Sequence, residues 1–319
     1  MKFAVALLIT AFAALTVWGQ SPPTLRIVTE IPNLPSDLYY GTTKVKPLRL
    51  RPGTNTPITI NDADFFVNQQ YVDFLSRFPD QSGFDFWTNQ ITACGANATC
   101  VDGLRTNTSG AFFLSIEFQE TGYLVERMYK VAYGDAQAQS TDGGAHPILV
   151  PIVRRSEFLP DTLEISNGVI VNQGNWQALL ESNKVAFAND FVSRSRFTTA
   201  YAGMSNSQFV DTLNSNAGNP LSATERNQLV SDLTGGVKTR AQVVRAVAED
   251  QDLNVAEKNK AFVLMQYFGY LRRDPNSGPD TDYSGYDFWL KKLNAHGGDF
   301  HAAEMVRSFL VAGEYLNRF

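Results

Sequence analysis

One stretch of sequence occurs twice, and it decides the fold class. Residues Phe66–Pro79 read FVNQQYVDFLSRFP, and residues Phe262–Pro275 read FVLMQYFGYLRRDP. In the first copy the apolar residues recur every three or four positions, which places them on one face of an α-helix. Asn61 or Asp62 is suited to begin this helix, because either side chain can cap a helix N-terminus. The proline at the end of each stretch predicts a break in the helix.

The segments that follow the two stretches are also repeated. Ser82–Trp87 reads SGFDFW and Ser284–Trp289 reads SGYDFW, and each predicts a second, shorter helix after the break. Further on, Phe113–Phe118 (FLSIEF) is answered by Phe309–Tyr315 (FLVAGEY). Matches in the same order at a nearly constant offset indicate duplication of one unit. The sequence therefore predicts a mainly α fold, an array of helical hairpin repeats.

A degenerate copy lies between the two clear ones. It has helical patterns but lacks the Asp-Phe-Trp signature, and these patterns cover residues 209–213, 224–233 and 239–247. We therefore divide this part of the chain into a first helical module at 62–133 and a helical region at 175–319, which holds the middle and last copies. The connection at 134–174 reads as a loop, because it is rich in Gly and Pro.

The repeated unit resembles a known family. The motifs of Tyr71–Asp80, Gly83–Trp87 and Phe113–Phe118 are similar to the bacterial domain-of-unknown-function family 4214, and Tyr270–Pro275 with Gly285–Trp289 looks like the same signature. The resemblance spans roughly residues 62 to 319. It implies a helical repeat module of secreted or cell-surface bacterial proteins, it implies no reaction, and it transfers no catalytic residue.

The last copy departs from the family pattern in one respect, because its loop at Asn276–Tyr283 is longer than usual. The loop and the sequence before it gather the oxygen ligands Asp274, Asn276, Asp280 and Asp282, which suit Ca²⁺ chemically. The EF-hand pattern fails, however, because the twelfth position counted from Asp274 is Gly285 and prolines interrupt the loop. Such residues are also the ones that turns favour, and we prefer that interpretation.

The N-terminal sequence predicts that the protein is exported. Lys2 precedes the apolar run Phe3–Val17, and Val17-Trp18-Gly19 provides a small residue at the end of a signal peptide. We expect residues 1–19 to be this signal, with cleavage after Gly19. An uncleaved N-terminal anchor is the alternative, although the run is shorter than the about 20 residues of a membrane span. The predicted location is secreted, periplasmic or cell surface.

Residues 20–61 differ from the rest of the chain because they are rich in proline. Prolines at this density oppose helix and central strands, so we predict an extended leader. The short runs Leu25–Val28 and Pro57–Ile60 are β-like and could pack on the main body.

Composition excludes several classes of partner. The 319 residues are 44% hydrophobic and 18% charged, with a formal net charge of −5. A phosphate backbone is bound by clustered Lys and Arg, so we expect no nucleic acid. After signal cleavage no segment is apolar enough to span a membrane.

The two cysteines, Cys94 and Cys100, are six residues apart. In an exported chain such a pair is most simply a disulfide. Metal binding is the weaker alternative, because no second pair completes a tetrahedral site. A second candidate group of metal ligands is small. It consists of His301 and Glu304, which are three residues apart on a predicted helix face, with His296 before them. Neither set carries a standard ligand pattern, so we predict no metal and no cofactor.

Trp87 and Trp289 are the candidate ligand residues. Aromatic side chains can stack on a sugar ring, but an aromatic that recurs in a helical repeat is usually core packing, and we prefer that interpretation. Adjacent helix positions point to different sides, so one member of each Phe-Trp pair could still reach the surface.

The sequence contains no recognised nucleophile elbow, P-loop or dinucleotide fingerprint. We therefore expect a non-enzymatic interaction or structural role at the cell envelope or outside it, with an envelope or extracellular protein or a glycan as partner. The alternatives are a carbohydrate-binding module that uses the tryptophans, and a secreted hydrolase whose site the sequence does not reveal.

Overall fold

The computed structural model describes residues 24–31, 33–34, 37–46 and 49–319, and it confirms a mainly α-helical chain. The chain divides into two compact units, Met1–Pro47 and Leu48–Phe319. The predicted signal peptide, residues 1–19, lies outside the described residues. None of the helices in the described ranges is both long and apolar enough to cross a membrane.

The first unit contains a small antiparallel sheet. Its strands are β1 (Leu25–Val28), β2 (Asp37–Tyr40) and β3 (Thr43–Val45), in the order β1-β2-β3. The β-like run at Leu25–Val28 is confirmed as a strand, whereas β2 and β3 were not expected from the proline-rich sequence. The other β-like run, Pro57–Ile60, is not a strand and makes only an isolated bridge between Pro57 and Leu50. Gly41, with a φ of 61°, makes the tight turn between β2 and β3 possible.

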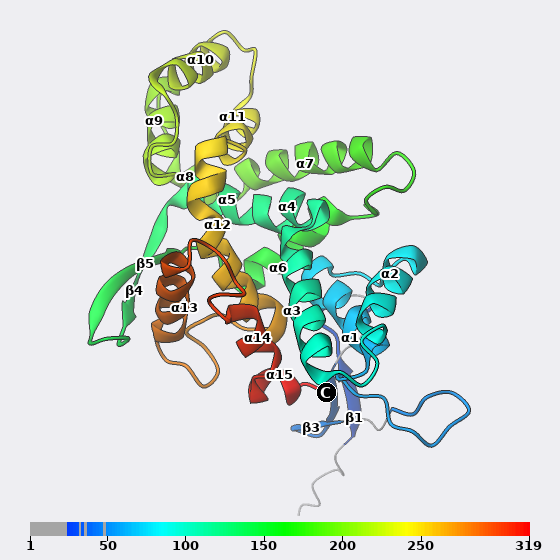
Figure 1. The fold of residues 1–319 in the computed structure, drawn as a ribbon. Helices are drawn as coiled ribbons and strands as arrows, with labels where there is room; N and C mark the ends of the chain where they lie inside the picture. The colour runs from blue at the N-terminus through cyan, green and yellow to red at the C-terminus, as the bar shows by residue number, and fades with distance from the viewer. Residues whose placement is uncertain (1–23, 32, 35–36, 47–48) are drawn as a thin grey trace, which may run out of the picture. The chain divides into compact units, whose positions relative to one another are not determined.

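The second unit begins and ends with the repeated segments (Figure 1). The N-terminal elements are α1 (Ala63–Gln70), η1 (Tyr71–Leu75), α2 (Gln81–Thr92), α3 (Ala98–Leu114), α4 (Ile116–Glu120) and α5 (Gly122–Tyr133). The C-terminal elements are α12 (Gln251–Met265), η2 (Gln266–Leu271), α13 (Ser284–Ala295), α14 (Met305–Leu310) and α15 (Gly313–Leu316).

The repeated stretches end in the same way. η1 and η2 are π-helical turns that continue α1 and α12, and each is followed by a residue in the left-handed conformation, Ser76 at φ 54° and Arg272 at φ 52°. The predicted side-chain cap of the first helix does not form. Asp62 stands at the N-cap, but its carboxylate accepts from the Thr59 backbone N–H at 2.7 Å and from Arg51 at 2.8 Å instead.

The middle region is helical where the sequence predicted it. Its elements are α7 (Trp176–Ser193), α8 (Ser195–Ala200), α9 (Asn206–Asn216), α10 (Ala223–Thr234) and α11 (Arg240–Ala248). Reciprocal capping boxes begin α10 and α11, formed by Ser222 with Glu225 and by Thr239 with Gln242. These boxes satisfy backbone donors that a helix leaves unpaired at its start, which explains why the sequence marked the boundaries well.

The prediction of a loop at residues 134–174 is wrong. The segment forms a β-hairpin, β4 (Asp135–Ser140) with β5 (His146–Pro151), followed by α6 (Arg155–Ser166). Gly143 and Gly144 have positive φ and make the hairpin turn, so residues that read as loop markers connect two paired strands. Pro160 lies inside α6, where the contacts of this helix with α5 and α7 outweigh the lost backbone hydrogen bond.

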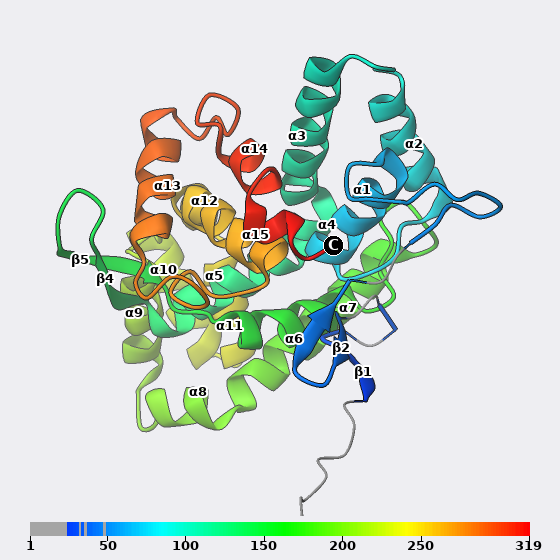
Figure 2. The same cartoon turned by 90° about the horizontal axis from the view of Figure 1, so that it is seen from below.

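The N-terminal and C-terminal helices share one core. The ring of Phe113 in α3 stacks on Phe262 in α12, with centroids 4.0 Å apart and planes 7° apart. Phe74 meets Tyr270 edge to face at 5.2 Å. Figures 1 and 2 both show α14 and α15 beside α1 and α3, and these contacts hold the two repeated segments together.

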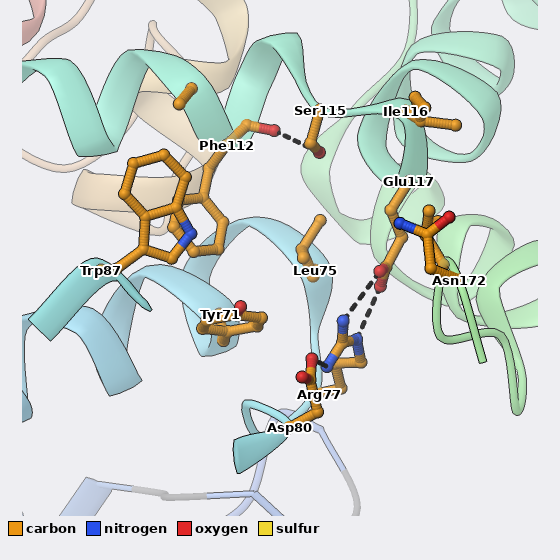
Figure 3. A pocket seen from close by; sticks show the side chains of 12 residues that line it. Tyr71, Leu75, Arg77, Asp80, Trp87, Phe112, Ser115, Ile116, Glu117 and Asn172 are labelled. Carbon is orange, nitrogen blue, oxygen red and sulfur yellow. Dashed lines mark hydrogen bonds and ion pairs between the residues drawn. The ribbon is translucent and has the colours of Figure 1, made fainter. Parts of the chain in front are cut away.

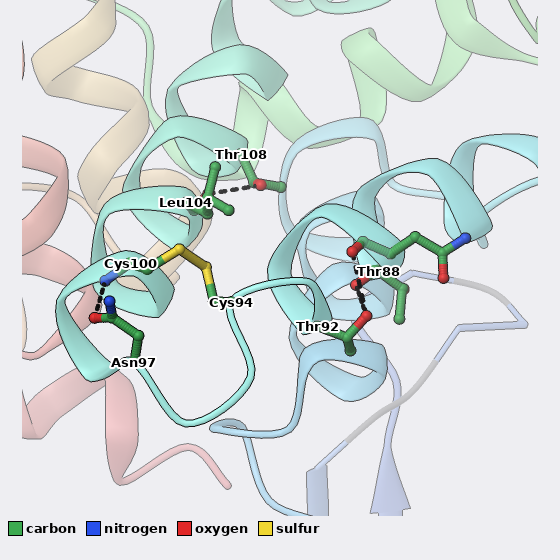
Figure 4. The surroundings of a disulfide bond; sticks show 8 residues. Thr88, Thr92, Cys94, Asn97, Cys100, Leu104 and Thr108 are labelled. Carbon is green, nitrogen blue, oxygen red and sulfur yellow. Dashed lines mark hydrogen bonds between the residues drawn. A yellow bond between two sulfur atoms is a disulfide. The ribbon is translucent and has the colours of Figure 1, made fainter.

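The two cysteines are paired in the structure, as predicted. The disulfide between Cys94 and Cys100 joins the turn after α2 to the first turn of α3 (Figure 4). The Asn97 side chain caps α3 by accepting from the Cys100 backbone N–H at 3.1 Å. The closed loop is short, so loop entropy gives the bridge about 2 kcal/mol of stabilisation.

A buried acidic pair lies between α5 and α12. Glu126 and Glu257 are both buried, and each has one carboxylate oxygen for which the described residues provide no hydrogen-bond partner. Lys260 contacts Glu257 at 2.8 Å and Lys130 contacts it at 3.8 Å. Burial, reinforced by the charge of Glu257, raises the pKa of Glu126 well above its ordinary value.

We expect Glu126→Gln to remove part of the pH dependence of stability. A carboxyl whose pKa is higher in the folded state keeps its full contribution below the unfolded pKa, about 4.3, and loses it as pH rises. The wild-type free energy of unfolding should therefore fall relative to the variant between pH 4 and pH 8, with similar values at pH 4. Urea unfolding at several pH values measures this difference, and two parallel stability curves would contradict it.

Candidate functional site

The first repeated segment forms an open pocket of about 200 Å³. Its lining comes from η1 and the loop that follows it, from α2, from the α3–α4 corner and from the segment that precedes α7. The lining residues are Tyr71, Leu75, Arg77, Asp80, Trp87, Ala111, Phe112, Ser115, Ile116, Glu117, Val171 and Asn172. We call this space the Trp87 pocket (Figure 3).

Aromatic rings form one side of the Trp87 pocket. Phe112 from α3 meets Tyr71 edge to face at 4.8 Å, and Trp87 from α2 lies tilted against Phe112 at 6.1 Å. Three consecutive elements therefore each contribute one ring. Trp87 is only partly buried, so part of its indole surface is left for a ligand.

An ion pair forms the other side, as Figure 3 shows. The guanidinium of Arg77 donates to both carboxylate oxygens of Glu117, from Nε at 2.7 Å and from Nη2 at 2.8 Å. Such bidentate pairs are strong and fix both side chains in orientation. Burial lowers the pKa of Arg77, but the hydrogen bond and charge of Glu117 outweigh it, so the pKa lies above its ordinary value.

Tyr71 connects the two sides. The guanidinium carbon of Arg77 lies 5.0 Å from the centre of the Tyr71 ring, which is a cation–π contact. Burial, together with the nearby charge of Asp80, raises the pKa of Tyr71 to about 12, so its hydroxyl stays protonated at neutral pH. This hydroxyl lies against Gly83, where any side chain would collide with it. The glycine before the aromatic pair is thus required by the position of Tyr71.

The same geometry occurs in the last repeated segment. Arg273 pairs with Glu314 through Nε at 2.6 Å and Nη2 at 3.0 Å, and its guanidinium carbon lies 5.4 Å from the Tyr267 ring centre. The Tyr267 hydroxyl lies against Gly285 as Tyr71 lies against Gly83. Trp289 lies tilted against Phe309 at 5.7 Å, and Phe309 meets Tyr267 edge to face at 5.3 Å.

The two candidate tryptophans are partly buried and partly exposed. Trp87 and Trp289 pack against the core but are partly exposed, and each lines a pocket. Their neighbours Phe86 and Phe288 point outward, with 57% and 44% of their surface exposed. The structure thus places each tryptophan both in contact with the core and at a surface where a ligand could reach it.

The Arg77–Glu117 and Arg273–Glu314 ion pairs were not predicted from the sequence. Arg77 and Glu117 are 40 residues apart. Both lie in the repeated motifs, but the motifs do not indicate that the two residues contact each other. A signal was present, since Arg273 and Glu314 repeat both residue types at matching places in the last copy. A charged residue that recurs with its opposite charge in two similar stretches of sequence indicates a possible ion pair in each.

The four candidate calcium ligands in the long loop each contact a different protein group. Asp274 accepts from the Arg155 backbone N–H at 2.9 Å, and Asn276 accepts from Arg154 at 2.8 Å. Asp280 pairs with Arg273 at 2.7 Å, while Asp282 caps the start of α13. These contacts agree with the preferred interpretation of the loop as a turn.

The histidine set is also dispersed. The helix face predicted for His301 and Glu304 is wrong, because Glu304 has a φ of 53° and α14 begins only at Met305. Within the described ranges, no group of three or more His, Cys, Asp or Glu side chains is placed to hold a metal ion.

Comparison with known proteins leaves the site to be interpreted from its own geometry. No family model matches this chain, and neither the curated proteins nor the solved structures provided a match. The function is therefore argued from the chemistry of the Trp87 pocket.

Proposed function

We propose that this chain is a non-enzymatic binding protein and that the Trp87 pocket is its ligand site. The observation that carries the proposal is the placement of a partly exposed tryptophan opposite a fixed Arg77–Glu117 pair in one open pocket. Concave sites with apolar walls and a few oriented polar groups are typical of small-ligand binding.

The chemistry of the walls favours a neutral carbohydrate as ligand. The aromatic side can accept the apolar C–H face of a sugar ring, as an indole accepts apolar contacts generally. Arg77 donates, and the carboxylates of Asp80 and Glu117 accept, so both kinds of hydroxyl hydrogen bond can be made. Two carboxylates against one guanidinium leave a net negative charge, which disfavours phosphate, sulfate or acidic sugars.

We further propose that the helical architecture consists of copies of one hairpin module of the family 4214 type. The paired contacts Tyr71–Arg77–Glu117 and Tyr267–Arg273–Glu314 support this, because they repeat in geometry as well as in residue type. The middle region α9–α11 would then be the degenerate copy.

The protein should act outside the cytoplasm, in a secreted, periplasmic or surface location. The Cys94–Cys100 disulfide supports this, because structural disulfides persist in oxidising compartments. Edman sequencing of the protein recovered from the culture fluid or periplasm should begin at Gln20. A sequence that begins at Met1 would contradict the predicted cleavage.

Trp87→Ala should weaken retention on neutral glycans while the chain stays folded. Loss of one stacking ring removes the apolar side of the pocket, and we expect at least a tenfold loss in affinity, which corresponds to about 1.4 kcal/mol. Glycan-array binding with parallel circular-dichroism melting measures both properties. Trp87→Phe is the matched control and should keep part of the affinity, because it retains a ring.

Two outcomes would contradict the proposal. Unchanged glycan binding by a folded Trp87→Ala protein would exclude the pocket as the ligand site. Release of shorter sugars from a bound oligosaccharide by the wild-type protein would show turnover and would make the protein a hydrolase.

A further inference from the structure

The last repeated segment contains a second pocket, of about 210 Å³. We call it the Trp289 pocket, and it is lined by Tyr267, Leu271, Arg273, Asp280, Trp289, Ser308, Phe309 and Ala312. Its rings have the same residue types as those of the Trp87 pocket, and Arg273 and Asp280 correspond to Arg77 and Asp80, but Glu314, which pairs with Arg273, is not among its lining residues. The two pockets therefore offer a ligand the same combination of an aromatic side and a polar side.

The two tryptophans differ in one charged neighbour. The ammonium of Lys292 lies 5.3 Å from the centre of the Trp289 ring, which is a cation–π contact over one face of the indole, although Lys292 is not among the residues that line the pocket. The matching position after Trp87 is Gln90, which is uncharged. Lys292 is held only loosely on its other side, 3.9 Å from the exposed carboxylate of Glu304. A ligand that stacks on this face of Trp289 must displace or share this ammonium.

The two pockets also share no lining residue. Their tryptophans lie on α2 and α13, and in both views these helices are kept apart by the packed segments α3 and α14 (Figures 1 and 2). The two segments are held together by the Phe113–Phe262 stack and by the Phe74–Tyr270 contact. Because this core is shared, both pockets belong to one compact unit.

We propose that the Trp289 pocket is a second, weaker binding site for the same neutral carbohydrates, so that one chain holds two glycan segments at once. The inference rests on the proposed function of the Trp87 pocket. Its independent support is the repeated set of rings and charges, together with a physical reason for unequal affinity, namely Lys292 over the second indole. A chain with two such sites cross-links a polysaccharide without forming an oligomer.

Isothermal titration with cellohexaose, chitohexaose and mannohexaose tests the proposal on the full mature chain. The wild-type protein should bind one of these hexasaccharides at two sites of unequal affinity. Trp289→Ala should leave only the tighter site and Trp87→Ala only the weaker one. Lys292→Gln, which copies the first pocket, should raise the weaker affinity by at least threefold and leave the tighter one unchanged.

The outcomes separate the two proposals. One site that disappears in Trp87→Ala and persists unchanged in Trp289→Ala would overturn the second site and keep the first. No binding of any hexasaccharide to the wild-type protein would overturn both. With a soluble polysaccharide of the bound sugar, light scattering should increase with the wild-type protein and not with Trp289→Ala. Equal scattering by the two proteins would also overturn the second site.

Discussion

Asp73→Asn should cost about 3–5 kcal/mol of folding free energy, the usual cost of removing one partner from a buried charge pair. The Asp73 side chain is completely buried, with an exposed fraction of 0%. Arg318 donates to its two oxygens at 2.7 and 3.0 Å, and Arg272 donates at 3.2 Å. The variant keeps the shape of the side chain but removes the charge that both guanidinium groups face. Chemical denaturation followed by circular dichroism measures the loss.

The position of Asp73 makes this variant informative about the architecture. The residue belongs to η1 in the first repeated segment, whereas both arginines belong to the last one. The matched control is Asp190→Asn, which removes a carboxylate from an exposed i,i+4 pair with Arg194 and should hardly change the denaturation midpoint. Similar midpoints for Asp73→Asn and the wild type would show that this contact does not hold the segments together.

Phe113→Ala should cost about 3–5 kcal/mol as well, the range for emptying a large buried aromatic side chain. Phe113 is fully buried in α3 and makes the closest ring contact of the shared core, with Phe262 of α12 at 4.0 Å. Its removal leaves a cavity between the first and last segments, which backbone shifts can close only in part. Thermal and urea unfolding of the variant provide the measurement.

Phe86→Ala is the matched control for this cavity. Phe86 has the same side chain and also lies on a helix, but 57% of its surface is exposed. Its loss should change stability far less than the loss of Phe113. Comparable destabilisation by the two substitutions would contradict the assignment of the core to the α3–α12 contact.

The helical part of the fold was predictable because its signals are local. Helical patterns predicted α1, α2, α7 and α9–α11. These features act within a few residues, so a linear sequence displays them. The β4–β5 hairpin and α6 were missed because their Gly and Pro residues also suit a loop, and only packing against neighbouring elements decides between the two.

The candidate site was predictable in part. Trp87 and Trp289 were singled out because they recur, and the structure places both at pockets. The polar side of each pocket was missed, because Arg77 and Glu117 come from elements that the fold brings together across 40 residues. Duplication was the only available signal for these pairs, and it shows that a residue recurs without showing what it contacts.

The sequence by itself determined that the repeated segments are helical and where they break, since these features depend on backbone preference and on nearby neighbours. Tertiary structure alone decided that Tyr71, Trp87 and Phe112 surround one pocket, and that Asp73 lies where two distant arginines converge. The physical reason is that helical periodicity assigns each residue to a face of its own helix. The partner of that face is selected only when distant helices pack and exclude water from the rings and charges between them.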